Sequence, residues 1–177
     1  LLALPLGQAA EKTGAVVTVH PLATKAAEYA FIQGGNAVDA AVAAALTLGV
    51  VDGFNSGIGG GCFMLIRKPD GTFVAIDGRE TAPQKASRDM FLHDGKADPD
   101  LSRTGALAIG VPGALAAYDL AIREHGNIDL AEHLGQAAAI AEKGFALDKA
   151  YLRRLGQAVK KLRQFPDSAR IFLGPDG

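Results

Sequence analysis

The chain has 177 residues, 49% of them hydrophobic, which is enough to bury a sizeable core in one domain or in part of a larger one. Its 18 basic and 19 acidic residues nearly cancel, so nothing recommends a nucleic-acid partner. A single cysteine excludes an internal disulfide, and no apolar run reaches the roughly 18 residues that a membrane span needs. We therefore expect a globular chain with neither a nucleic-acid partner nor a membrane span.

The first twelve residues differ in character from the rest. Residues 1–10 are mostly apolar and close on small residues, which is typical of the end of a signal-peptide hydrophobic segment, although the basic stretch that normally precedes it is missing. The alternative is an irregular terminus. We expect residues 1–12 to be one of these two and residues 13–177 to form the folded segment. The predicted location is periplasmic or secreted, with the cytoplasm as the alternative.

The first half of the sequence predicts two helices and a β-hairpin. Pro21 suits the first turn of a helix, and Asn36 can cap a second helix that is apolar on almost every face and should be buried. A turn at 69–71 separates two strand candidates. In chain order, the expected elements are a strand at 14–19, helices at 21–33 and 37–49, and strands at 62–67 and 72–77.

The strand at 62–67 is apolar without interruption up to its last residue. Continuous rather than alternating apolarity predicts a sheet that is covered on both faces, as between two layers. A polar loop at 84–104 follows the hairpin. The remainder is predicted to be helical, with helices at 112–126, 129–144 and 148–164.

Several charged or reactive side chains have structural interpretations. The four histidines show no metal-ligand spacing, and no second cysteine joins them, so we expect no metal site. Cys62 stands among apolar neighbours and is interpreted as a small core residue rather than a reactive thiol. A basic cluster in the last predicted helix is interpreted as a solvent-exposed face, and a docking site for a partner is the alternative. The cluster consists of Arg153, Arg154, Lys160, Lys161 and Arg163.

The glycine run Ser56–Gly61 does not match a nucleotide-binding loop. It lacks the Gly-Lys-Ser/Thr ending of a phosphate loop, and it precedes a strand, whereas a phosphate site needs a helix N-terminus. Ser56 is preceded by Asn55, so it does not lie in the Gly-x-Ser-x-Gly turn of a hydrolase nucleophile either. The run predicts a structural turn that also lets the backbone approach a neighbour closely and shape a site.

Arg79 is the candidate ligand-binding residue, because it follows the hairpin in a tight turn and its planar guanidinium can hold a carboxylate. A salt bridge that closes the turn explains the pattern equally well. Asp77 and Glu80 flank it and could act as acid and base, but ion pairing or capping beside an arginine is the commoner reason for such a pattern.

Six sequence blocks then appear in a recognisable order and spacing, and together they resemble the gamma-glutamyltranspeptidase family. The resemblance covers nearly all of the chain from Gly14 onward. The blocks are HPLA at 20–23, GGNAVDAAVA at 34–43, SGIGGG at 56–61, DGRETAP at 77–83, GVPG at 110–113 and AEKGF at 141–145.

The resemblance implies an α+β fold, part of the four-layer αββα sandwich of an N-terminal-nucleophile hydrolase. Members are made as precursors that cut themselves into a large and a small subunit, and this chain is similar to the N-terminal part of the large one. The family's catalytic threonine is the first residue of the small subunit, so we expect no catalytic residue in this chain. We also expect no cofactor and no metal, since acyl transfer to threonine needs only a nucleophile, a base and oxyanion donors.

Arg79 is the one residue to which the resemblance assigns a role, that of binding the α-carboxylate of a γ-glutamyl substrate. The implied activity is glutathione hydrolysis and γ-glutamyl transfer by the complete protein, with the small subunit as partner. Two departures put the substrate in doubt: Asp52–Asn55 replaces a segment that often contains Glu-Pro, and Cys62 stands where a further glycine is common. A cephalosporin or glutaryl acylase of the same family is the alternative, and a non-catalytic module derived from the family is a third hypothesis.

Overall fold

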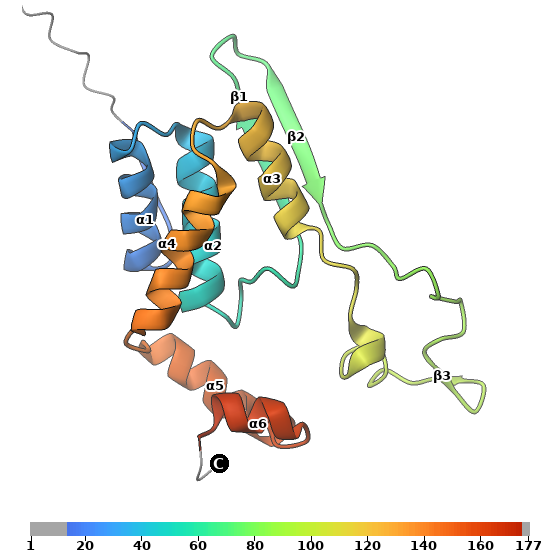
Figure 1. Cartoon of the computed structure of the whole chain (residues 1–177). Helices are drawn as coiled ribbons and strands as arrows, with labels where there is room; N and C mark the ends of the chain where they lie inside the picture. Colours follow the sequence, from blue (N-terminus) through green and yellow to red (C-terminus); the bar gives the residue numbers. More distant parts are fainter. Residues whose placement is uncertain (1–13, 175–177) are drawn as a thin grey trace, which may run out of the picture.

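Two alanine-rich helices pack side by side in the first part of the chain. The computed structural model describes residues 14–174, so the predicted signal-peptide remnant lies outside the described residues. α1 (Pro21–Ile32) packs along α2 (Ala37–Val51), and α4 (Leu130–Lys143) covers α2 from another side (Figure 1). Small side chains let the first two helices approach closely, and the buried ones are Ala23, Ala26, Ala27, Ala30, Ala40, Ala43 and Ala44.

The turn between these helices is fixed by its polar residues. Gly34 has φ +89°, a conformation that favours glycine. The Asn36 side chain accepts hydrogen bonds from the backbone amides of Val38 and Asp39, and the Asp39 carboxylate accepts one from the Asn36 amide in return. This reciprocal capping confirms the predicted start of the second helix, which extends to Val51, two residues beyond the expected end.

The predicted hairpin is present. β1 (Cys62–Arg67) and β2 (Phe73–Gly78) pair antiparallel, with Cys62 opposite Gly78 and Arg67 opposite Phe73. The inner face of the hairpin packs against α2 and α3 (Ala114–His125) and buries Ile76. The other face, which we call the outer face, exposes large apolar side chains. Its members are Phe63, Leu65 and Phe73.

The continuous apolarity of the first strand predicted that both faces of the hairpin would be covered. The described residues cover only one face. The helices of residues 14–174 supply a single layer over the two-stranded sheet, and no described segment packs on the outer face. The continuous apolar run is consistent with a sheet that needs a second layer from elsewhere.

A long excursion connects the hairpin to α3. It contains the short strands β3 (Leu92–His93) and β4 (Lys96–Ala97) and the 3₁₀ turn η1 (Ala106–Ala108), and Figure 1 shows it projecting from the core. The excursion begins and ends at one place, because the backbones of Thr81 and Val111 exchange two hydrogen bonds of 3.2 and 2.9 Å. The loop predicted from its polar composition is thus confirmed, with a tether that the composition did not indicate.

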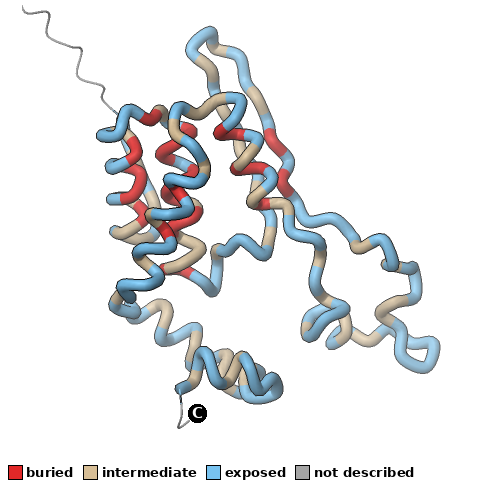
Figure 2. The backbone as a smooth tube through the Cα atoms, viewed as in Figure 1, coloured by how far each residue is buried: buried red, intermediate tan, exposed pale blue. Residues whose placement is uncertain are grey.

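The C-terminal helices stand apart from the core. α5 (Lys149–Leu162) and α6 (Pro166–Phe172) contain no fully buried residue (Figure 2). The basic residues of the predicted solvated face are all exposed, in agreement with that interpretation. α6 was not predicted. The strand expected at 14–19 is wrong: those residues form no strand, because no described segment offers them a ladder partner. Within residues 14–174, no helix is both long and apolar enough to cross a membrane.

Candidate functional site

The glycine run meets the end of the hairpin at a contact that we call the glycine junction, formed by Gly60, Gly61, Gly78 and Gly113. The amides of Gly113 and Ala114, at the start of α3, both donate to the Gly60 carbonyl at 3.1 Å. A Cβ on Gly61 would lie 2.7 Å from the carbonyl oxygen of Gly78, and a Cβ on Gly113 would lie 2.5 Å from that same oxygen. Side chains are therefore excluded from the junction, as the run of glycines predicted.

Arg79 extends directly from this junction. Its amide donates to Asp77 Oδ1 at 2.9 Å, so Asp77 caps the turn rather than standing free as an acid or base. The guanidinium lies 5.8 Å from the centre of the Phe63 ring, at the end of the outer face, and its side chain is 66% exposed. The Arg79 Nε atom is 3.8 Å from Glu80 Oε2, and such an exposed pair contributes little to stability. The backbone of Arg79 is thus held in place, while its guanidinium remains exposed and can contact a ligand.

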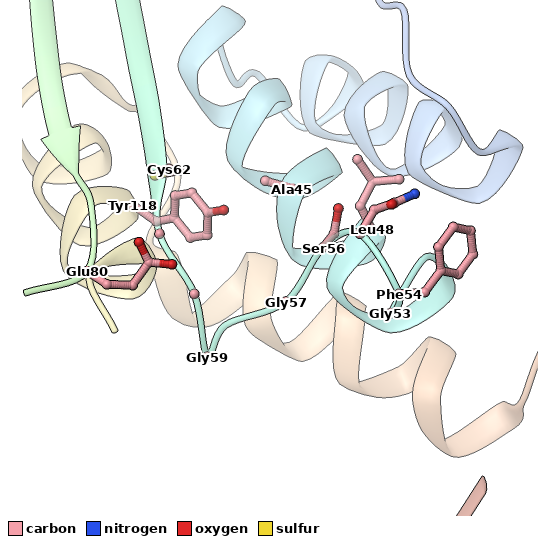
Figure 3. Close-up of a pocket in the computed structure, with 13 residues that line it drawn as sticks. Ala45, Leu48, Gly53, Phe54, Ser56, Gly57, Gly59, Cys62, Glu80 and Tyr118 are labelled. Atoms are coloured by element: carbon pink, nitrogen blue, oxygen red, sulfur yellow. The ribbon is translucent and has the colours of Figure 1, made fainter. Parts of the chain in front are cut away.

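A polar cavity of about 560 Å³ lies beside the junction. Its wall is formed by the end of α2 and the loop that follows it, together with Glu80, Cys62 and Tyr118 (Figure 3). Glu80 is the charged residue in this lining. Its carboxylate lies against the glycine backbone: Cβ atoms on Gly60 and Gly61 would come within 3.3 and 2.8 Å of its oxygens. The junction therefore positions two consecutive side chains, Arg79 beside the outer face and Glu80 in the cavity.

Cys62 and Tyr118 form a neutral pair in the wall of this cavity. Burial raises the pKa of the Cys62 thiol, and a hydrogen bond with the Tyr118 side chain offsets part of that effect. Burial also raises the pKa of Tyr118, with a further contribution from the neighbouring cysteine. A thiol that ionises less readily than usual is a poor nucleophile at neutral pH, which favours the interpretation of Cys62 as a packing residue.

The histidines lie in separate places. His20 caps α1 through its Nδ1 atom, His93 is in the projecting excursion, His125 ends α3 and His133 is buried in α4. Among the residues that the structure describes, no cluster of three or more His, Cys, Asp or Glu side chains could hold a metal ion.

A buried polar centre that the sequence did not predict supports the site. Asp39 is completely buried, and its carboxylate accepts hydrogen bonds from the amides of Asn36, Asn127 and Ile128 at 2.7 to 3.1 Å. These bonds attach α2 to the loop between α3 and α4, and α3 begins at the glycine junction. The signal in the sequence is an aspartate in an otherwise apolar helix, but in the first turn a favourable interaction with the helix dipole is already a sufficient explanation.

Comparison with known proteins gives a consistent result. The family model described as gamma-glutamyltranspeptidase matches residues 23–177. The glutathione hydrolase proenzyme of Escherichia coli (strain K12) is 44% identical over 140 residues, which cover 78% of this chain and 24% of that protein. The acylase ACY 1 proenzyme of Pseudomonas sp. (strain V22) is 44% identical over 141 residues, covering 76% and 25%.

A solved structure agrees. The crystal structure of Helicobacter pylori gamma-glutamyltranspeptidase matches with a TM-score of 0.86 and 37% identity, over 90% of this chain and 46% of that one. The chain spans about a quarter of the length of the curated relatives named above.

Proposed function

The chain belongs to the gamma-glutamyltranspeptidase family, and from this membership we propose that the complete protein cleaves γ-glutamyl amides such as glutathione. The γ-glutamyl group passes to water, an amino acid or a peptide. The observation that carries the proposal is the accessible guanidinium of Arg79, which extends from a backbone fixed by the glycine junction. The fold is the corresponding part of an N-terminal-nucleophile hydrolase sandwich.

In this proposal Arg79 binds the α-carboxylate of the donor. A guanidinium can donate two parallel hydrogen bonds to a carboxylate, and charge-assisted bonds of this kind are about twice as strong as neutral ones. Two bonds fix orientation as well as distance. Anchoring the α-carboxylate therefore holds the γ-carbonyl, three carbons away, in one place for attack.

The nucleophile in this proposal is a threonine outside the present chain, at the start of the small subunit. Its hydroxyl attacks the γ-carbonyl and its own α-amino group takes the proton, since an α-amino group titrates at about 7.7 to 8.0. The names of the relatives as proenzymes support a precursor that is cut into two subunits. The exposed outer face, with Phe63, Leu65 and Phe73, is where we propose that the rest of the protein adds the second layer.

An acylase activity is the second candidate, and the similarity to acylase ACY 1 favours it specifically. A glutaryl group carries the same distal carboxylate as a γ-glutamyl group and lacks only the α-amino group. Arg79 serves both substrates equally, so the choice between them depends on residues that recognise the amino group.

The test compares chromophore release by the complete processed protein from a γ-glutamyl anilide and from the matching glutaryl anilide. Preference for the γ-glutamyl anilide supports the first proposal, and preference for the glutaryl anilide supports the acylase. If a processed small subunit is present and neither compound is cleaved, both proposals fail. A precursor that lacks the threonine and remains uncut instead supports a non-catalytic module.

A further inference from the structure

Two residues that face each other across the hairpin both contact Arg79. Phe63 and Asp77 are direct partners in the register of β1 and β2, so their side chains lie on the same face of the sheet. Asp77 Oδ1 accepts the hydrogen bond of the Arg79 amide at 2.9 Å, and the Phe63 ring centre lies 5.8 Å from the guanidinium carbon Cζ. One cross-strand pair therefore contacts both the backbone and the charged end of the arginine.

The guanidinium is contacted on one face and at one nitrogen. Its distance from the Phe63 ring is within the limit of about 6 Å at which a cation is attracted to an aromatic face. The Glu80 carboxylate lies 3.8 Å from Nε. These contacts leave the terminal amino groups, Nη1 and Nη2, to donate in parallel to the carboxylate of a ligand.

The exposure of Arg79 is the reason that such a contact matters. Its side chain is 66% exposed, and a long exposed side chain has many rotamers, which the binding of a ligand must restrict. The bond from Asp77 fixes the backbone but not the guanidinium. A flat ring beneath the guanidinium restricts it before the ligand arrives, and this preorganisation lowers the cost of ordering on binding.

We propose that Phe63 is a positioning residue for substrate binding: its ring holds the Arg79 guanidinium at the end of β1, so that the terminal amino groups meet the substrate carboxylate in one orientation. The inference rests on the proposed function, because it assigns Phe63 an effect on the carboxylate that Arg79 binds. Phe63 acts through the arginine and needs no contact of its own with the substrate.

The outer face also provides a matched control. Phe63 and Phe73 are both large exposed rings on this face, where the second layer is proposed to pack. Phe73 lies at the other end of the hairpin, opposite Arg67. Removal of either ring therefore costs the proposed interface a similar side chain, whereas the contact with Arg79 belongs to Phe63. Cation–π attraction strengthens when water is excluded, so a second layer makes the contact at Phe63 stronger.

The experiment measures kcat and KM of the complete processed enzyme for the γ-glutamyl anilide. Phe63→Leu removes the ring and keeps an apolar side chain for packing. It is expected to raise KM about three- to tenfold while kcat stays within about twofold, because the lost contact affects substrate and transition state alike. Phe63→Tyr keeps an aromatic face and should stay within about twofold of the parent KM, as should the control Phe73→Leu.

A double variant tests whether the ring acts through the arginine. In an Arg79→Ala background, Phe63→Leu should change KM by less than about twofold, since the guanidinium is already absent. An increase of about three- to tenfold in that background would show a direct effect of the ring and overturn the inference. A parental KM in Phe63→Leu, or an equal rise in Phe73→Leu or Phe63→Tyr, overturns it as well. Phe63→Met is the second ring-free variant, judged by the same criteria, if Phe63→Leu does not fold.

A second measurement separates this inference from the proposed function. Glutarate carries the carboxylate that Arg79 is proposed to bind, and its affinity for the complete protein can be measured by calorimetry without turnover. If the parent cleaves no γ-glutamyl anilide but, like Phe73→Leu, binds glutarate about three- to tenfold more tightly than Phe63→Leu does, the positioning role stands and the activity does not. Equal glutarate affinities of the parent and Phe63→Leu, or no binding to the parent, overturn the positioning role.

Discussion

Asp39 of α2 and His133 of α4 lie 3.5 Å apart, measured from Oδ1 to Nε2, and both side chains are completely buried. The two side chains contribute unequally to the hydrogen bonding of this buried pair. The Asp39 carboxylate accepts hydrogen bonds from three backbone amides, whereas neither ring nitrogen of His133 has a hydrogen-bond partner. The carboxylate therefore joins two segments of backbone, the turn before α2 and the loop between α3 and α4, and the imidazole lies beside it.

This difference in hydrogen bonding predicts that substitutions of the two residues change the free energy of unfolding by different amounts. Asp39→Ala removes a fully buried carboxylate and leaves three backbone amides without that acceptor, so it should lower the free energy of unfolding by about 3 to 5 kcal/mol. His133→Leu replaces a ring that makes no hydrogen bond by an apolar side chain of similar size, while the three amides still hold the carboxylate, and should change the free energy of unfolding by less than about 1 kcal/mol. Urea denaturation of the complete protein followed by circular dichroism measures both. A His133→Leu variant that is as unstable as Asp39→Ala would show that the imidazole is an essential partner of the carboxylate.

Arg79→Ala should raise KM for the γ-glutamyl anilide about 10- to 100-fold, because the substrate loses a pair of charge-assisted hydrogen bonds. Cleavage of the precursor into subunits should continue, since the guanidinium is exposed and supports no core contact. Arg67→Ala is the control: it removes a guanidinium from the other end of β1. Steady-state kinetics and gel analysis of processing test the pair. An unchanged KM in Arg79→Ala would remove Arg79 from the binding site.

The glycine junction predicts that an alanine substitution lowers stability strongly at a glycine within the junction and only slightly at a glycine outside it. A Cβ at Gly113 would meet the carbonyl oxygens of Gly78 and Arg79 at 2.5 and 2.6 Å, so Gly113→Ala should cost about 1 to 3 kcal/mol and raise KM as well. Gly59 lies in the same run as Gly61, but a Cβ there meets nothing within 4 Å, so Gly59→Ala should stay within about 0.5 kcal/mol of the parent. Thermal unfolding and donor kinetics measure both. Equal effects of the two substitutions would contradict the role of the junction.

Stability should fall at alkaline pH through Cys62 and Tyr118. Both groups have raised pKa values in the folded protein, relative to 9.0 and 10.0, so the unfolded chain ionises first. Their contribution is fully present below pH 9.0 and is lost as the pH rises through the folded pKa values. Urea midpoints between about pH 8 and about pH 10.5 should decline less steeply for a Cys62→Ala, Tyr118→Phe variant than for the parent. Parallel declines would exclude these two groups as the cause.

Local signals in the sequence were sufficient for most of the helices and for the hairpin. Asn36 has the side chain that caps α2, and the turn at 69–71 separates two strands of equal length, so short-range chemistry determines both features. The prediction of a strand at 14–19 was wrong because a strand depends on a long-range partner as well as on local signals. A strand needs a partner, and β-branched residues alone cannot supply one; Val17 and Val19 remain exposed.

In the candidate site, too, features that depend on local residue types could be predicted, whereas features that depend on distant partners could not. Arg79 and the glycine run were identified from their residue types, because a carboxylate ligand and a close backbone approach each require particular chemistry. Tyr118 and Cys62 line the same cavity although they are far apart in sequence, and the pattern around one does not indicate the other. The bonds of Asp39 could not be predicted either, since its amide donors at Asn127 and Ile128 come from a loop far along the chain.

The pair of backbone bonds between Thr81 and Val111 has a consequence for how this protein can vary. Since the excursion leaves and returns at this pair, we expect changes in its distal part to be transmitted only weakly to Arg79. Insertions, deletions or cleavage within 84–104 should leave the guanidinium in place. The distal excursion is therefore a part of the described chain in which evolution, or a protein engineer, can add new surface away from the site.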